Sequence, residues 1–282
     1  MDSKIIVLQS DFTYKEGAVA SMHGVIKSVD ATIEITDATH EIPKFDIWSA
    51  SYRLMQYVRF WPKGTVFVSV VDPMVGTSRR ASLAITGDGY IILSPDNGSF
   101  HHIKKTGGIA SIYEIDIDRH RLRGYGTDAV SVFHGRDVFA HTAALIASGK
   151  IRYSDAGSAY PADEIVGFSE PEPYMEDGRV HGFIEISDPN FGNLWTNIPI
   201  GLFREAGFGC HDLLNVEITY KGETVFNDRV PFEASFGFVE RGHPVIYQNE
   251  MMKAAFGIFM GNAAEEYSIG YGTEWEVDFR HE

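Results

Sequence analysis

Apolar and polar residues follow two kinds of spacing in the first half of the chain. Short β-branched runs predict buried strands at residues 4–10, 32–36 and 65–71. Apolar residues recur at helical spacing over residues 18–29, 45–59 and 138–148. Because strand and helix patterns follow one another, we expect an α/β fold here: a layered, mostly parallel, Rossmann-like domain.

A hairpin is predicted after the third of these strands. Residues 81–86 and 90–94 both have strand character, and the Gly87-Asp88-Gly89 segment between them is typical of a tight turn. The helix predicted at residues 138–148 should end before Gly149, since glycine readily adopts the left-handed conformation that closes helices.

The pattern changes in the second half of the chain. Residues 160–178 are rich in proline and acidic residues and show little periodicity, which predicts a linker. Short strand patterns with few helices between them follow at residues 180–186, 213–220, 223–230, 245–248 and 274–279. We therefore expect an N-terminal α/β domain at residues 1–159 and a smaller C-terminal all-β domain, a barrel or sandwich, at residues 179–282.

Composition narrows the possible partners and compartments. The 44% hydrophobic and 22% charged residues are typical of a soluble globular protein, and the net charge of −15 argues against binding to a nucleic-acid backbone. Cys210 is the single cysteine, so neither a disulfide framework nor a thiolate metal cluster is expected. No apolar run approaches the ~20 residues of a membrane helix. We expect a cytoplasmic protein that does not enter a membrane.

The segment after the strand at residues 65–71 carries the strongest candidate chemistry. Asp72 stands where that strand ends, Pro73 and Gly76 turn the chain, and Arg79 follows seven residues later. In open α/β sheets, sites form at the carboxyl ends of strands. An acid and a guanidinium held together there can fix a small polar molecule between them.

Two other polar positions have both a functional and a structural interpretation. Asp11 follows the first strand, where a carboxylate can bind a ribose diol, but for this position taken alone an Asx-turn or a helix N-cap is the favoured interpretation. Asp137 is predicted as the N-cap of the helix at residues 138–148, with His134 just upstream. A single histidine in such a place is more often structural than functional.

Two further segments can be interpreted in more than one way. In residues 188–197, Phe191, Asn193 and Trp195 alternate, so an extended chain would place them on one face, suited to stacking and hydrogen bonding with a purine. A β-bulge with ordinary core aromatics explains the same pattern. Residues 94–98, with the sequence SPDNG, have the composition of a plain turn.

We expect no metal site. The chain has no P-loop, no Gly-x-Ser-x-Gly elbow and no His-Glu-x-x-His motif. His101 and His102 are adjacent, and adjacent residues face apart on regular structure, so they should not chelate one ion.

Taken together, the motifs resemble those of one enzyme family. They run in the family's order: SDFT at residues 10–13, THEIPKFDI at 39–47, VDPMVGTSRR at 71–80, SPDNG at 94–98, FHGRDVFA at 133–140, DPNFGNLWTNI at 188–198 and GNAA at 261–264. The chain resembles the S-adenosyl-L-methionine (SAM) hydroxide adenosyltransferases, or SAM hydrolases, which are related to the fluorinase and chlorinase SAM-dependent halogenases. The resemblance spans nearly the whole chain.

The resemblance implies a reaction and an assembly. The family cleaves SAM with water at the ribose C5′ to give adenosine and L-methionine, with SAM as substrate and without a metal or an organic cofactor. Its fold implies an N-terminal α/β domain, a C-terminal β-barrel and a homotrimer with its sites at subunit contacts.

The resemblance also implies roles for individual residues. The Asp–Arg–His triad that positions the water falls on Asp72, Arg79 and His134. The resemblance also implies that the other positions bind the substrate. The ribose would be bound by Asp11 and Phe45, the adenine by Phe191, Asn193 and Trp195, and the methionine end by Asp188 and Glu16.

Several positions depart from the family's pattern. Met74 replaces a glycine, His141 a proline and Glu250 a serine, and the serine–arginine pair of the halogenases has no clear counterpart near Met260. A SAM-dependent 5′-halogenase is the alternative enzyme, but the carboxylate of Asp72 would repel a halide. Two non-enzymatic hypotheses are a non-catalytic SAM- or adenosine-binding protein and a trimeric scaffold, and neither function needs the full triad.

Overall fold

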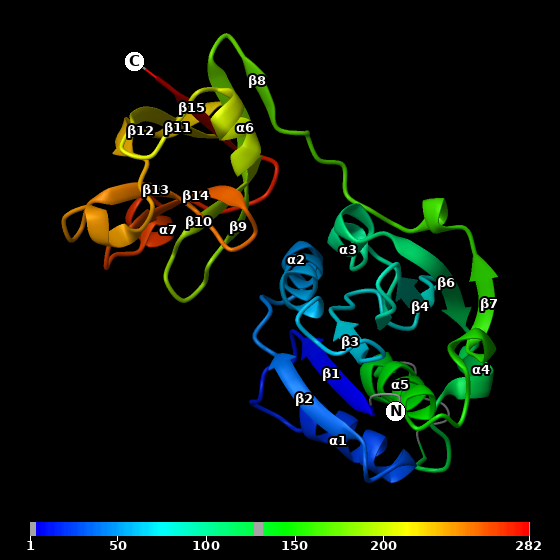
Figure 1. Cartoon of the computed structure of the whole chain (residues 1–282). Helices are drawn as coiled ribbons and strands as arrows, with labels where there is room; N and C mark the ends of the chain where they lie inside the picture. The colour runs from blue at the N-terminus through cyan, green and yellow to red at the C-terminus, as the bar shows by residue number, and fades with distance from the viewer. Residues whose placement is uncertain (1–3, 127–131, 282) are drawn as a thin grey trace. The chain divides into compact units, whose positions relative to one another are not determined.

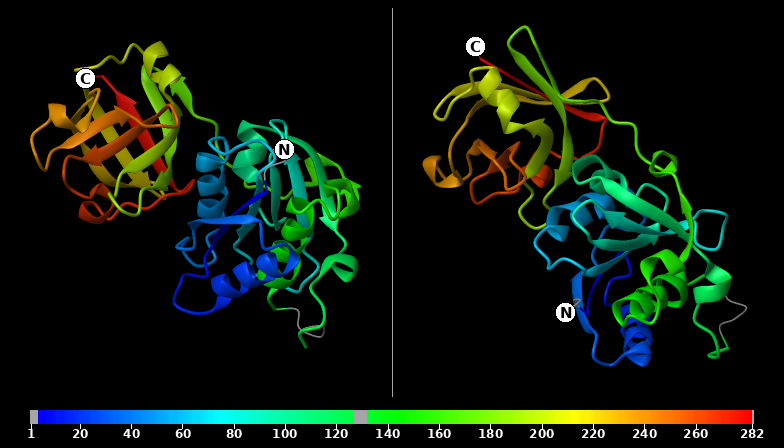
Figure 2. Two further views of the ribbon diagram at one scale, coloured as in Figure 1. Left: turned by 60° about the horizontal axis from the view of Figure 1, so that its bottom comes forward. Right: turned by 45° about the vertical axis from the view of Figure 1, so that its right-hand side comes forward.

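Two compact units make up the chain. The structure is a computed structural model that describes residues 4–126 and 132–281. The first unit is Met1–Phe168 and the second is Ser169–Glu282. Figures 1 and 2 show that the first contains helices and a sheet, and that the second consists mainly of strands. In the described part of the chain, no helix is both long and apolar enough to cross a membrane.

The first unit is built on a seven-stranded sheet with the order β2-β1-β3-β5-β4-β6-β7. Its strands are β1 (Ile5–Ser10), β2 (Glu34–Thr39), β3 (Val66–Val70), β4 (Ala81–Thr86), β5 (Ile91–Pro95), β6 (Ile109–Ile115) and β7 (Gly157–Tyr160). The pairs β1–β2, β1–β3 and β3–β5 are parallel, whereas β4–β5, β4–β6 and β6–β7 are antiparallel. The α/β class is confirmed, but the expectation of a mostly parallel sheet was wrong. The β4–β5 hairpin reverses the chain direction, and β6 and β7 then continue antiparallel.

Helices cover both faces of this sheet (Figure 1). They are α1 (Ala18–Val29), α2 (Ile47–Val58), α3 (His101–Thr106), α4 (Ile117–His120) and α5 (His141–Ala147), with short 3-10 turns at Tyr153–Asp155 and Ala162–Glu164. On one face, Leu8 of β1 and Val68 of β3 pack with Met22 of α1 and Phe139. On the other face, the buried amide of Gln9 donates a hydrogen bond to the Ala50 carbonyl of α2, 2.9 Å away. Successive residues of β1 thus anchor opposite helical layers.

The helix predicted at residues 138–148 begins earlier than expected. A π-helical turn, Gly135–Ala140, precedes α5, and His134 stands immediately before it. Asp137 is therefore inside the helical segment, where its buried carboxylate accepts hydrogen bonds from Arg136, 2.6 and 3.0 Å long. The interpretation of Asp137 as the N-cap was wrong, because the π-turn adds helical residues upstream of the periodic apolar pattern.

The second unit is an eight-stranded antiparallel sheet that nearly closes into a barrel (Figure 2). Its strands are β8 (Tyr174–Glu176), β9 (Arg179–Ser187), β10 (Leu194–Pro199), β11 (Leu213–Tyr220), β12 (Glu223–Pro231), β13 (Pro244–Gln248), β14 (Lys253–Ile258) and β15 (Trp275–Arg280). The main path runs β12-β11-β15-β9-β10-β14-β13, and β8 pairs with β9. A bridge from Phe232 to Ile246 joins the two ends of this path. The predicted all-β barrel class is confirmed.

The barrel encloses one apolar core. Phe203, Phe256 and Phe279 are fully buried in it. The short helices α6 (Ile200–Glu205) and α7 (Ala263–Glu266) and a 3-10 turn at Phe236–Phe238 lie in the connections between strands. The β9–β10 loop carries Phe191 and Asn193, two of the residues expected to contact adenine, and the third, Trp195, follows in β10.

Candidate functional site

Asp11 and Asp72 both lie just beyond the carboxyl ends of strands in the first sheet. Strands β1 and β3 are parallel neighbours, and their register places Ser10 opposite Val70. Asp11 follows Ser10 directly, and Asp72 follows Val70 by two residues. The carboxyl ends of adjacent parallel strands thus bring both carboxylates to one edge, which is where α/β proteins build ligand sites.

Asp72 and Arg79 form a buried ion pair. Nε of Arg79 donates to both carboxylate oxygens of Asp72 at 3.0 Å, and Nη2 donates to Oδ2. Each side chain is only 5% exposed. Consecutive turns, with Gly76 at φ 78°, return the chain so that Arg79 meets Asp72. A two-pronged guanidinium–carboxylate pair of this kind fixes both side chains in one orientation.

His134 joins this pair through the same guanidinium. Nη2 of Arg79 lies 2.9 Å from Nδ1 of His134, whose ring is buried. A guanidinium can only donate, so Nδ1 accepts the hydrogen bond and the ring proton is on Nε2. Burial, followed by the positive charge of Arg79, lowers the pKa of His134 below its ordinary value of 6.5. The triad thus contains a carboxylate, a guanidinium and a neutral imidazole.

Arg79 has one donor that is not used within the described residues. Its Nη1 is buried and has no hydrogen-bond partner in the described ranges, 4–126 and 132–281. The guanidinium also lies over the ring of Phe139, 5.6 Å from its centroid. Buried donors are nearly always satisfied in proteins, by protein atoms, water or ligand. An oxygen acceptor is therefore the group that best completes this site.

A cleft opens beside the triad in the first unit. Its volume is about 410 Å³, and its lining combines apolar residues with Arg79 and a few polar groups: Ile47, Pro73, Met74, Ser78, Arg79, Arg80, Asp96, Asn97, Glu164 and Val166. This size and mixed lining are typical of pockets for small organic molecules.

Asp11 has neither of the two local structural roles that its sequence position suggests. Its Oδ2 accepts a hydrogen bond from the backbone N–H of Phe45, 3.0 Å away, and the N-cap of α1 is Gly17. The Asx-turn and N-cap interpretations were therefore wrong. Phe45 has a left-handed backbone, φ 65°, and the residue is 67% exposed. Glu16 is exposed in the bend before α1.

The predicted adenine-binding segment of the second unit is not one extended strand. Asp188 accepts hydrogen bonds from the backbone N–H groups of Asn190 and Phe191 at 3.0 and 3.2 Å, and so closes a turn. Gly192 follows at φ 69°, where an added Cβ would clash with the Asn262 side chain. Because β10 begins only at Leu194, the chain is not extended from residue 191 onward, and the condition for placing the three side chains on one face is not met.

The three predicted adenine contacts therefore differ in their surroundings. Phe191 is 63% exposed at the turn, and Asn193 lies just before β10. Trp195 is 8% exposed, and its indole N–H donates to the Tyr247 hydroxyl at 3.2 Å. Their binding roles stay predictions, as do those of Asp188 and Glu16.

The SPDNG segment does more than turn the chain. Asp96 is buried and accepts hydrogen bonds from the Tyr160 hydroxyl and the Val166 N–H, both at 3.0 Å. Burial raises the pKa of its carboxyl group. Asn97 donates to the Val71 carbonyl at 3.0 Å, which fixes the chain directly before Asp72. Sequence reasoning missed this role; the position of the segment at the end of β5, beside β3, is the signal that could have indicated it.

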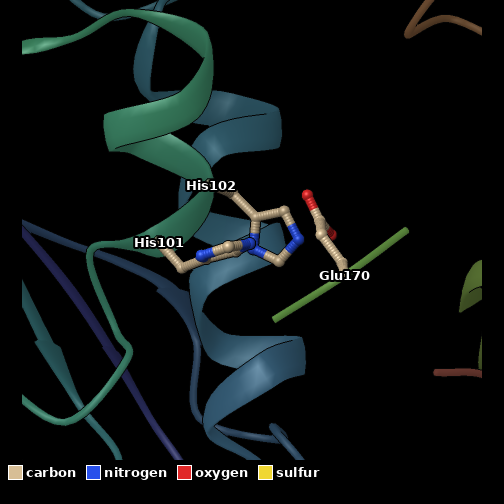
Figure 3. Close-up of side chains that lie close together, drawn as sticks. All are labelled: His101, His102 and Glu170. Carbon is tan, nitrogen blue, oxygen red and sulfur yellow. The ribbon is translucent and has the colours of Figure 1, made fainter. Parts of the chain in front are cut away.

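The expectation that His101 and His102 face apart was wrong. Their ring centroids are 4.9 Å apart at the start of α3, and Figure 3 shows the two rings close together. Both rings also contact Trp48 of α2. In the second unit, Cys210, His211 and Glu233 place one possible metal-ligand atom each within 4.8 Å of one another. His211 and Glu233 are paired directly at 2.9 Å. The absence of a metal stays a prediction.

Comparison with known proteins identifies the family to which this fold and site belong. The N-terminal domain model of the SAM hydroxide adenosyltransferases matches residues 6–157, and the C-terminal domain model matches residues 182–276. These matches cover most of the α/β unit and of the barrel. The chain therefore belongs to the SAM hydroxide adenosyltransferase family.

Three relatives illustrate the range of this similarity. The chain is 29% identical over 277 residues to the (R)-S-adenosyl-L-methionine hydrolase of Methanocaldococcus jannaschii, covering 97% of this chain and 95% of that protein. It is 29% identical over 292 residues to a fluorinase of an Actinoplanes species, covering 95% of both. An uncharacterized conserved protein from Thermotoga maritima has a similar crystal structure, with a TM-score of 0.88 and 28% identity over 98% of this chain and 100% of that one.

The geometry of the triad predicts the protonation of His134. In ¹⁵N-resolved NMR spectra, His134 should have an unprotonated Nδ1 and a protonated Nε2, with a pKa below 6.5. The His134→Gln variant identifies its signals. Because the pKa of His134 is lower in the folded protein than in the unfolded chain, a proton binds the unfolded chain more tightly. The stability that depends on neutral His134 is therefore complete above pH 6.5 and is lost as the pH falls toward the lowered pKa. A proton on Nδ1 at neutral pH would contradict this arrangement.

Proposed function

We propose that this protein is a SAM hydrolase, which uses water to cleave the bond between the ribose C5′ and the sulfonium sulfur. The products are adenosine and L-methionine. The observation that carries the proposal is the buried Asp72–Arg79–His134 triad, with an unused donor on Arg79 within the described residues, in a chain of this family. Relatives named SAM hydrolase support the same substrate.

The reaction demands little acid chemistry from the protein. As the new bond from oxygen to C5′ forms, the C5′–S bond breaks and its electron pair moves to the sulfonium. Methionine leaves as a neutral thioether, so no group has to protonate it. The protein's task is to hold one water in line with the breaking bond and to accept its proton.

The triad can divide this task. The Nη1 group of Arg79 can donate a hydrogen bond to the water oxygen. Asp72 keeps acceptor capacity beyond its bonds to Arg79 and can accept the water's hydrogen, then release the proton to solvent. Neutral His134 fixes the guanidinium through Nδ1 and can offer its Nε2 hydrogen to the water. Fixed donors in a buried site act more strongly than the same groups in water.

A 5′-halogenase is the second candidate because the chain is equally similar to a fluorinase. Asp72 argues against it. At 4 Å and an effective dielectric constant of 20, a carboxylate repels a halide by roughly 4 kcal/mol. The positive charge of Arg79 offsets much of this repulsion, so the ion pair as a whole offers a halide little net attraction to replace its hydration.

Asp11 and Phe45 are the proposed contacts to the ribose. Asp11 stands one strand away from Asp72 at the same sheet edge, which suits a nucleoside whose C5′ faces the triad. Phe191, Asn193 and Trp195 are proposed to contact the adenine, and Asp188 and Glu16 the methionine end. A cytoplasmic homotrimer, with sites completed by neighbouring copies, is proposed from the resemblance, as is the absence of a metal or organic cofactor.

Product analysis tests the proposed function directly. Incubated with SAM and EDTA, the protein should release adenosine and L-methionine in equal amounts, as seen by chromatography. If methylthioadenosine from spontaneous breakdown is the only nucleoside product, the proposal is wrong. With added chloride or fluoride, 5′-halogenated adenosine in place of adenosine would favour the halogenase instead.

Substitution of Asp72 separates chemistry from binding. The Asp72→Ala variant should lose about 10²–10⁴-fold in kcat, since a positioned proton acceptor is removed, while its affinity for adenosine stays near that of the wild type.

Asp11→Ala should instead weaken adenosine binding by about 1–3 kcal/mol, measured by calorimetry. Asp88→Ala, in the exposed β4–β5 turn, is the control for loss of one carboxylate. Normal turnover in Asp72→Ala would remove this residue from the mechanism.

Mixing of inactive chains tests the proposed shared site. Asp72→Ala changes the first unit and Asn193→Ala changes the second. If the two sets of contacts come from different chains, reassembled mixtures should contain some unmodified sites and regain part of the activity. Either variant reassembled alone is the control. If the two variants carry different affinity tags and co-purify as mixed trimers, no recovery of activity would mean that each chain completes its own site.

A further inference from the structure

A chain of buried hydrogen bonds runs behind Asp11. Ser10 and His40 are fully buried, and Oγ of Ser10 lies 2.6 Å from Nδ1 of His40. Nε2 of His40 lies 3.1 Å from Oδ1 of Asp37, and the same oxygen lies 2.8 Å from Nε2 of His23. Ser10, Asp37 and His40 stand in or just after the last residues of β1 and β2, which pair side by side in the sheet (Figure 1), and His23 is on α1.

The direction of each hydrogen bond follows from the chemistry of the groups. Burial raises the pKa of Asp37, but hydrogen bonds from His23 and His40 outweigh it, and the pKa lies below its ordinary value. Asp37 thus accepts, and Nε2 of His40 carries the proton. Burial lowers the pKa of His40, which leaves Nδ1 unprotonated. Ser10 therefore donates to Nδ1, and its oxygen accepts the Phe12 N–H at 3.2 Å.

This chain fixes the short segment that carries Asp11. The carbonyl of His40 accepts the N–H of Thr13 at 2.8 Å, so His40 holds residues 10–13 by both its ring and its backbone. Thr13 has a left-handed backbone, φ 58°, a conformation that costs a non-glycine residue free energy and persists only where surrounding contacts impose it. On the other side, the Asp11 carboxylate is bonded to the N–H of Phe45.

We propose that His40 is a positioning residue for the substrate: through Ser10 and Asp37 it holds Asp11 in the orientation that binds the ribose diol. The inference rests on the proposed function, which gives Asp11 its ligand. His40 itself is fully buried, so we place its effect on the substrate in its hold on Asp11 rather than in direct contact. A carboxylate that must accept two hydroxyl hydrogens at once tolerates little rotation, so a loosened segment should weaken binding rather than the reaction with water.

Ser10→Ala is the mildest test, because it removes one buried oxygen and leaves the ring of His40 in place. We expect the KM for SAM and the Kd for adenosine each to rise about tenfold, as for the loss of one to two hydrogen bonds, with kcat within about threefold of the wild type. Asp37→Asn should stay close to the wild type, since its amide oxygen can still accept from His40. Asp37→Ala should resemble Ser10→Ala.

Ser51→Ala is the matched control. Ser51 is a buried serine whose hydroxyl lies 3.0 Å from Nδ1 of a buried histidine, His102, in the same unit (Figure 3 shows His102). It stands on α2, and its hydroxyl bonds the N–H and the ring of His102 rather than a group in residues 10–13. We expect unchanged KM and Kd in this variant. An equal rise in both variants would mean that any buried serine–histidine pair supports the unit, and the positioning role would be lost.

A double-mutant cycle decides whether the effect passes through Asp11. In an Asp11→Ala background, Ser10→Ala should add no further loss of adenosine affinity, because the carboxylate it positions is gone. An undiminished additional loss would overturn the inference, as would unchanged binding in Ser10→Ala alone. If the wild type binds adenosine but does not turn over SAM, the proposed hydrolysis fails while the cycle still tests His40. If it does not bind adenosine, both proposals are wrong.

Discussion

The ion pair between Arg79 and Asp72 is the contact on which the arrangement of the candidate site depends. Both charges are withdrawn from water, and each buried ion costs several kcal/mol unless its partner and its hydrogen bonds are in place. Removing either partner would leave the other uncompensated. The guanidinium also orients His134, so one side chain fixes the other two members of the triad. This dependence explains why a turn, a strand end and a helix start must all be correctly placed.

The sheet supplies that placement. Because β1 and β3 are parallel and in register, the residues after them emerge together, and Asp11 and Asp72 are brought to one edge although 61 positions separate them in sequence. Asn97, after β5, then bonds the backbone at Val71 and stiffens the chain before Asp72. Asp11, Asp72 and Asn97 thus follow three neighbouring parallel strands, β1, β3 and β5, and each contributes to the candidate site.

Some features of the fold depend on interactions between residues close in sequence, and others on contacts between distant residues. The sequence predicts the first kind and not the second. The helix at Ala18–Val29 has the predicted bounds because its apolar spacing is a local signal. Strand β3 and the turn after it are equally local. The reversal of the sheet at β4 and the π-turn before α5 depend on tertiary packing, so periodicity cannot reveal them. The turn at Phe191 was missed because alternation of residue types does not exclude a left-handed glycine within the pattern.

The candidate site shows the same division. Asp72, Arg79 and His134 could be named from motifs, and the structure brings them together, although their proposed roles await experiment. His40 could not be given a role from periodicity, since its partner Ser10 is 30 residues away and a buried histidine is usually structural. Only the complete set of hydrogen bonds shows that its ring and its carbonyl hold the same four-residue segment.

The two carboxylates at these strand ends have different bonding partners, which suits them to the different tasks proposed for them. Asp72 is bonded to a cation, and its negative charge is balanced within the triad, so a sulfonium can approach without a large net field and a water can be held without an extra ion. Asp11 instead accepts a neutral backbone N–H through one oxygen, which leaves acceptor capacity on its carboxylate for the hydroxyl groups of a ribose. A carboxylate paired with a cation is held in one orientation toward a water, and one bonded to a neutral donor keeps acceptor capacity for a diol. The proposed hydrolysis needs both, side by side, and adjacent parallel strands provide that spacing.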